Sequence, residues 1–124
     1  MAFGQSSYSA QNLEQSDFIG SWVSNWASVK GEQQYLKITE NLTTTFKRTL
    51  EEKNREQLYT SGKNAAEIKD DLLIIGYQDE YGVLVYKLVL SGWRSNSTKA
   101  LYGTMFMYRK GKPYNGLPVS FSEN

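Results

Sequence analysis

Two pairs of adjacent carboxylates, Asp70-Asp71 and Asp79-Glu80, are the residues of this sequence best suited to acid–base catalysis. Two carboxylates in different surroundings can act as general acid and general base. Both pairs, however, lie where the sequence predicts turns, and neighbouring residues of an extended chain point to opposite faces. We therefore interpret them as solvated turn residues and expect the protein not to be an enzyme.

Histidine and cysteine are both absent from the 124 residues. Without histidine, the chain lacks the commonest general base and the commonest metal ligand. Without cysteine, it can form no disulfide, thiolate nucleophile or thiolate metal centre. The carboxylates lack the alternate spacing of a calcium loop, and no known glycine-rich phosphate loop is present. The sequence therefore predicts neither a metal site nor a cofactor.

The length and composition favour one all-β domain. A chain of 124 residues suits a single domain, and its nine Tyr, five Phe and three Trp are residues that prefer strands. Residues 1–16 are predicted to be a flexible N-terminal leader and residues 17–124 the folded domain. The leader is not an intact signal peptide, but it could follow a removed one, which slightly favours a periplasmic or secreted location. No apolar run approaches the length of a membrane span.

Alternation of apolar and polar residues predicts about eight short antiparallel strands and no long helix. The clearest pair spans residues 83–91 and 98–109. On the first of these, Leu84, Tyr86, Leu88 and Leu90 are expected to share one face. The other predicted strands are 17–26, 34–40, 42–50, 58–60 and 72–77. Residues 65–69 fit either a strand or a helical turn, and residues 114–124 are expected to form a short extended tail.

The residues Gly20-Ser21-Trp22, on the first predicted strand, resemble the Gly-X-Trp signature of the calycin superfamily, which includes the lipocalins. The resemblance implies a lipocalin-like fold, a single antiparallel up-and-down barrel of about eight strands. In that superfamily the Trp packs near an Arg from a late strand, and Arg109 matches that position here. The resemblance therefore implies that Trp22 and Arg109 close one end of the barrel, and it implies no particular ligand.

The first hypothesis for function is non-catalytic binding of a small apolar or amphipathic ligand inside the barrel. An eight-stranded barrel holds either packed side chains or one small ligand. Two methionines on one strand favour an adaptable pocket. The expected lining residues, drawn from one face of each strand, are Leu36, Phe46, Leu84, Tyr86, Leu88, Met105 and Met107. The alternative is that these side chains simply fill the core.

A second hypothesis is a protein-interaction or inhibitor module that acts through its loop ends. Residues 92–97 are expected to form a polar hairpin tip carrying Trp93 and Arg94, and both residue types are favoured at binding hot spots. A third hypothesis is single-stranded nucleic-acid binding by the aromatic and basic residues of 81–112. The net charge of only +1 and the acidic first half of the chain argue against nucleic acid.

Overall fold

The computed structural model describes residues 8–9, 13–25, 31–50, 55–60, 66–95 and 98–124. These residues form ten strands and one short 3-10 helix, η2. Their bounds are β1 Tyr8–Ser9, η2 Gln15–Asp17, β2 Gly20–Ser24, β3 Glu32–Ile38, β4 Thr44–Leu50, β5 Arg55–Thr60, β6 Ala66–Lys69, β7 Leu72–Gln78, β8 Leu84–Ser95, β9 Thr98–Arg109 and β10 Lys112–Glu123.

All the strands belong to one antiparallel sheet, in the order β5-β4-β3-β2-β10-β9-β8-β7-β6, with β1 added beside β8. Two meanders make up this order, a first meander of β2–β5 and a second of β6–β10, and they are joined where β10 pairs with β2. The all-β prediction is therefore confirmed. Within the described residues the end strands β5 and β6 do not pair with each other, so the predicted closed barrel is not confirmed.

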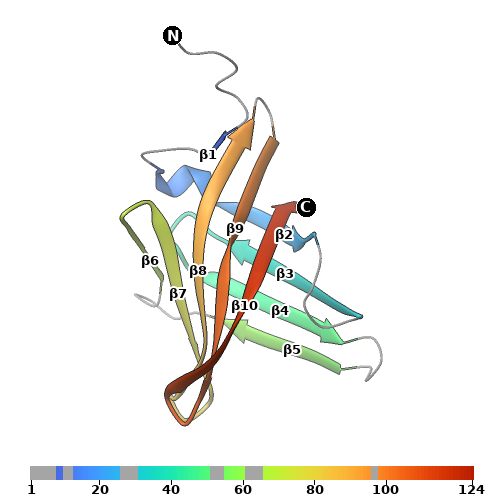
Figure 1. Ribbon diagram of the computed structural model, residues 1–124, viewed down its shortest axis with the longest axis vertical. Coiled ribbons are helices and arrows are strands. Elements are labelled where there is room, and N and C mark those ends of the chain that lie inside the picture. The colour runs from blue at the N-terminus through green and yellow to red at the C-terminus, as the bar shows by residue number, and fades with distance from the viewer. Residues whose placement is uncertain (1–7, 10–12, 26–30, 51–54, 61–65, 96–97) are drawn as a thin grey trace.

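The two meanders pack against each other through their inner faces. In Figure 1 the first meander, blue to green, crosses the long strands β8, β9 and β10 of the second. Phe46 of β4 stacks on Tyr77 of β7, with ring centroids 5.6 Å apart. Inward-facing residues of both meanders, such as Leu36 and Leu88, are fully buried. The sheet thus folds over on itself, and its core lies between the two halves.

One glycine allows the long hairpin of β8 and β9 to bend. Gly103 of β9 faces Leu90 of β8, and a Cβ atom at Gly103 would lie only 1.9 Å from the carbonyl oxygen of Val89. No side chain fits in that space, because glycine alone lets two backbones approach so closely. Gly103 is therefore required by the course of the sheet.

The two carboxylate pairs lie in turns, as the sequence predicts. Asp70 and Asp71 have φ angles of 54° and 63°. Two consecutive residues with positive φ form the tight hairpin turn that matches the twist of a β-sheet. The Asp79 carboxylate accepts hydrogen bonds from the backbone N–H groups of Tyr81 and Val83, at 2.9 and 3.0 Å. Both pairs thus have roles in shaping hairpins.

Part of the segment expected to be a flexible leader belongs to the folded domain. Strand β1 pairs with β8, and Leu13 is buried against Gly92, whose missing Cβ leaves the space that the leucine fills. The Leu13 N–H also donates a 2.9 Å hydrogen bond to Asp71. Residues 1–16 are mostly polar, so their sequence does not predict these contacts with the sheet.

The C-terminal residues form a twelve-residue strand inside the sheet instead of the expected short tail. Pro113 and Pro118 argue against a strand in the middle of a sheet, because proline cannot donate to the ladder. Strand β2 pairs only with Phe121, Ser122 and Glu123. Among the described residues, both prolines therefore pair with β9 alone.

Candidate functional site

The inner face of β3 changes from polar to apolar along its length. Its four inward residues are Glu32, Gln34, Leu36 and Ile38, and all four are buried. On β4 the same change runs from Arg48 to Phe46, since Arg48 pairs with Gln34 and Phe46 with Leu36. The interior between the meanders therefore has a polar end and an apolar end.

A hydrogen-bonded polar cluster, made of Glu32, Gln34, Arg48, Gln57 and Tyr86, occupies the polar end. The Arg48 guanidinium donates from Nε to Glu32 Oε2 at 3.0 Å, from Nη2 to Glu32 Oε1, and from Nη1 to the Tyr86 hydroxyl at 2.6 Å. The Tyr86 hydroxyl lies 3.4 Å from Gln57 Oε1. Gln34 Nε2 donates to Glu32 Oε2. The cluster joins β3, β4 and β5 of the first meander to β8 of the second.

The ion pair at the centre of the cluster is almost fully enclosed. The side chains of Arg48 and Glu32 are 7% and 1% exposed. Burial by itself lowers the pKa of the Arg48 guanidinium, but its hydrogen bond to Glu32, together with the interactions of Tyr86 and Glu32, raises that pKa above its ordinary value. Arg48 therefore stays charged, and the pair as a whole is neutral.

Gln34 is 3% exposed, and none of the described residues donates a hydrogen bond to its amide oxygen Oε1. Buried polar atoms in proteins nearly always have a hydrogen-bond partner, so such an atom needs an explanation.

Aromatic rings border the polar cluster on its apolar side. Tyr86 meets Tyr59 edge to face, with ring centroids 5.0 Å apart, and meets Phe46 at 6.2 Å. Tyr59 also packs beside Tyr77, at 6.3 Å. Met107 lies opposite Tyr86 in the sheet and packs on the core. Polar and aromatic groups thus meet in one region of the interior.

The structure brings together six of the seven residues predicted to line an interior pocket. Leu36, Phe46, Leu88 and Met105 are fully buried in the core, Tyr86 belongs to the polar cluster, and Met107 is partly buried beside it. Glu32, Gln34 and Arg48 were not among the residues predicted to line the site. One signal was available, because Arg48 shares its face of the strand with Phe46 and the alternation of β3 extends back to Glu32.

Leu84 is the predicted lining residue that the structure places elsewhere. A bulge in β8 makes Tyr77 pair with Tyr86 and Gln78 with Leu84, so Val85 is an extra residue. The bulge reverses the side-chain alternation, and Leu84 Cδ1 lies over Gly76 while Val85 packs on the core. The prediction that Leu84 shares a face with Tyr86 and Leu88 is wrong for this reason.

Trp93 and Arg94 do not form a free hairpin tip. Strand β8 continues through both residues to Ser95, and β1 pairs with them along one side. Arg94 Nη1 lies 2.5 Å from Asp17 Oδ1, and Trp93 is half-buried. The predicted interaction anchors therefore help to hold the N-terminal segment on the sheet.

The expected contact between Trp22 and Arg109 is not formed. Arg109 is exposed, and its guanidinium lies 4.5 Å from the centroid of the Tyr114 ring. Strand β10 pairs with Arg109 through Lys112 and with Trp22 through Glu123, so the two residues lie at opposite ends of β10. Trp22 is buried, and its indole N–H donates a 2.9 Å hydrogen bond to the carbonyl of Phe18. The resemblance thus rests on Gly20-Ser21-Trp22 alone.

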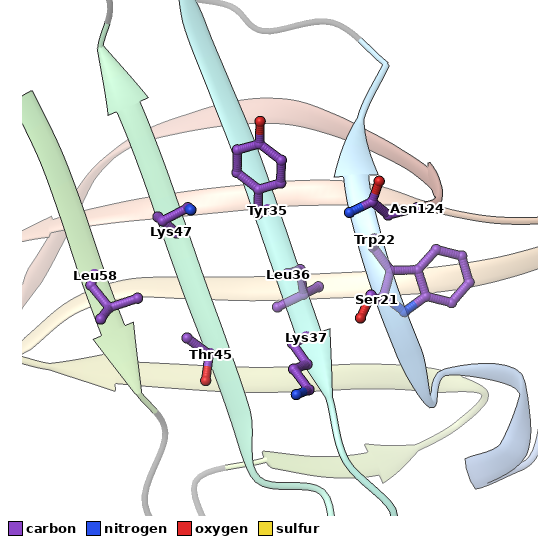
Figure 2. A pocket seen from close by; sticks show the side chains of 9 residues that line it. All are labelled: Ser21, Trp22, Tyr35, Leu36, Lys37, Thr45, Lys47, Leu58 and Asn124. Carbon is purple, nitrogen blue, oxygen red and sulfur yellow. The ribbon is translucent and has the colours of Figure 1, made fainter. Parts of the chain in front are cut away.

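A second feature, here called the outer pocket, is a depression of about 260 Å³ over the first meander. Figure 2 shows its lining side chains spread across β2, β3, β4 and β5, with Asn124 after the end of β10 beside them. Lys37 lies beside Ser21 and Thr45, and Lys47 lies between Tyr35 and Leu58. The Lys47 ammonium sits over the Tyr35 ring, 4.7 Å from its centroid. Within the described part of the chain neither lysine forms an ion pair, so the outer pocket is cationic.

Tyr77, at the apolar end of the interior, is expected to make the free energy of unfolding fall as the pH rises above 10. Burial raises the pKa of its hydroxyl well above the ordinary value of 10.0, although a 2.6 Å hydrogen bond with Thr44 lowers it in part. Because the unfolded chain releases this proton more readily, the stabilisation is complete below pH 10 and is lost as pH rises further. We expect unmodified protein to lose about 1.4 kcal/mol relative to Tyr77→Phe by pH 11. Urea unfolding of both proteins between pH 8 and 11 measures this, and parallel pH curves would contradict it.

Among the described residues, no helix has the length and apolarity needed to cross a membrane. A scan of the chain against protein-family models and searches against curated proteins and solved structures find no match.

Proposed function

We propose that the protein is a non-catalytic, lipocalin-like binding protein that takes a small amphipathic ligand between its two meanders. The observation that carries this proposal is the buried polar cluster in direct contact with aromatic rings at one end of the interior. An amphipathic ligand has the same division, with a polar head and an apolar body. The head group would lie at Gln34 and Arg48, and the body along Phe46, Tyr59 and Met107.

The energetics of the cluster support a role beyond folding. A buried ion pair gains little net stability over well-packed apolar residues, because removing two charges from water is costly. A domain that needed only a core would be at least as stable with apolar side chains at Glu32 and Arg48. Retaining polar groups there is expected where they serve recognition.

Binding can be tested by filling the proposed site. N-phenyl-1-naphthylamine is a neutral amphipathic probe whose fluorescence rises in apolar surroundings. We expect saturable enhancement with the unmodified protein and at least tenfold weaker binding for Met107→Trp, because Met107 lies opposite Tyr86 and a larger side chain there would crowd the proposed site. Tyr102→Trp, on the same strand but exposed, is the matched control and should bind as the unmodified protein does. No saturable binding by the unmodified protein would reject the proposal.

A second candidate function is interaction with an anionic partner through the outer pocket. The favouring observation is that Lys37 and Lys47 lie on one sheet face without an ion pair in the described residues, next to Leu58, which is 60% exposed. Exposed apolar surface beside unpaired charges is a feature of interaction sites. In this second candidate function the interaction surface is the outer pocket, and not Trp93 and Arg94 as the sequence predicts.

The outer pocket can be tested with a short glutamate-rich peptide as probe. We expect weak, salt-sensitive binding whose backbone amide NMR shifts centre on β3 and β4, and loss of those shifts in the double variant Lys37→Gln/Lys47→Gln. The control Lys87→Gln/Lys110→Gln removes the same charge from the second meander and should bind normally. Equal loss in both double variants would mean that only net charge matters, and the candidate site would be abandoned.

A further inference from the structure

We propose that Asn115 is a site of spontaneous deamidation, in which the backbone nitrogen of Gly116 displaces the side-chain amide as ammonia. Asn115-Gly116 is the one Asn-Gly pair in the sequence. Both residues are exposed and lie in strand β10. Glycine favours such a reaction because, without a Cβ atom, it lets another group approach its backbone closely. The site is on the surface and does not depend on the proposed ligand.

The backbone N–H of Gly116 faces the side of β10 away from β9. In an antiparallel pair the N–H and C=O groups of one residue point to the same side, and residues two apart point alike. The Ser120 carbonyl faces β2, because it accepts a 2.9 Å hydrogen bond from the N–H of Asn25. Pairing with β9 is regular from Asn115 to Ser122, so Gly116, four residues before Ser120, faces the same side. Among the described residues β2 reaches only Phe121, Ser122 and Glu123, and it does not cover Gly116.

The Asn115 side chain binds this N–H group. The N–H of Gly116 donates a 2.9 Å hydrogen bond to Asn115 Oδ1. Oδ1 is bonded to Cγ, the carbon atom that the nitrogen attacks. The fold thus holds the two reacting groups next to each other before the reaction, and such positioning accelerates intramolecular steps.

The reaction needs only water and hydroxide. Hydroxide removes the proton from the Gly116 nitrogen, which forms a bond to Asn115 Cγ, and the bond from Cγ to Nδ2 breaks. Nδ2 takes a proton from water and leaves as ammonia, so hydroxide is regenerated and a five-membered succinimide remains. Water then opens the ring at either carbonyl, which gives aspartate or isoaspartate at position 115. The rate should rise with pH, because the attacking nitrogen must first lose its proton.

The two products should differ in their effect on the fold. Aspartate places one negative charge at an exposed position, and isoaspartate also inserts a methylene group into the backbone of β10. The longer backbone cannot keep its ladder with β9 regular on both sides of position 115, and the buried Val119 and Phe121 follow in the same strand. We therefore expect the isoaspartate form to unfold at a lower urea concentration than the aspartate form.

Incubation of the folded protein at pH 8, followed by peptide mass spectrometry, tests the site. We expect Asn115 to react at least about tenfold faster than Asn41. Asn41 is a matched internal control, because it is also exposed but the N–H of the next residue, Leu42, donates to the carbonyl of Thr39. Gly116→Ala should slow the reaction by about tenfold, because the added methyl group hinders attack by the nitrogen.

A comparison with the unfolded chain separates the effect of the fold from that of the sequence. In guanidinium chloride at the same pH the Asn-Gly pair is retained but the hydrogen bond from Gly116 to Asn115 is lost. We expect Asn115 to react at least as fast in the folded protein as in the unfolded chain. Slower reaction in the folded protein, or equal rates at Asn115 and Asn41, would overturn the proposal. If Gly116→Ala does not fold, these two comparisons on the unmodified protein still decide.

Discussion

Gly103→Ala is expected to lower the free energy of unfolding by about 3 kcal/mol or more. The new methyl carbon would lie 1.9 Å from the carbonyl oxygen of Val89 and 3.1 Å from the Cα atom of Leu90. These are backbone atoms of β8, so no side-chain rotation can relieve the overlap, and the two long strands must separate. Strain of this kind in a packed region is among the few causes of very large single-residue effects.

Gly116→Ala is the matched control for Gly103→Ala, because both glycines lie in long neighbouring strands. A Cβ atom at Gly116 would meet the Thr104 methyl group at 3.4 Å and the Phe106 ring at 3.5 Å, which are close to ordinary contacts with side chains. We expect a change of less than about 1 kcal/mol for this control. Urea unfolding followed by circular dichroism measures both variants. Equal midpoints for Gly103→Ala and the unmodified protein would show that β8 and β9 do not approach so closely.

Removing one partner of the buried ion pair is expected to have the other large effect. Glu32→Leu leaves the Arg48 charge enclosed without a counter-ion, and Arg48→Leu does the same to Glu32. Breaking a buried pair in this way typically costs about 3–5 kcal/mol. In the double variant Glu32→Leu/Arg48→Leu neither charge remains, and its stability should return to within about 2 kcal/mol of the unmodified protein.

The double-mutant cycle measures the coupling between the two residues directly. Additive losses in the double variant would contradict the enclosed pair, since exposed charges couple by only about 1 kcal/mol or less. The same double variant also bears on function. If it is as stable as the unmodified protein but no longer binds the naphthylamine probe, the polar cluster serves recognition at no gain in stability, as expected for a binding site.

Local alternation predicted the elements that depend on neighbouring residues alone. The strand predicted over 98–109 matches β9 residue for residue, and the buried strand predicted over 72–77 extends by only one residue. The turn predicted at Asp70-Asp71 is also confirmed. Two aspartates before an apolar run are a local signal, because aspartate tolerates the positive φ angles that the turn requires. Such features need no knowledge of which strands become neighbours.

Features that depend on the partner strand were missed. Residues 112–123 look unlike a strand because of Pro113, Gly116 and Pro118, and they become one because β9 supplies a full ladder on one side. Leu84 was assigned to the inner face because period-2 alternation has no means of detecting a bulge. That bulge exists only in the pairing of β8 with β7.

The candidate site shows the same division between sequence and structure. The sequence by itself determined the all-β class, the absence of histidine and cysteine chemistry, and most of the apolar inner faces, because composition and alternation express them directly. Tertiary structure decided that Glu32, Gln34 and Arg48 form one buried cluster and that Tyr86, 38 residues beyond Arg48, completes it. The physical reason is that a charged residue is buried only when partners meet it there: the counter-charge of Arg48 comes from the neighbouring strand β3, and its further hydrogen bond comes from Tyr86 of the opposite meander.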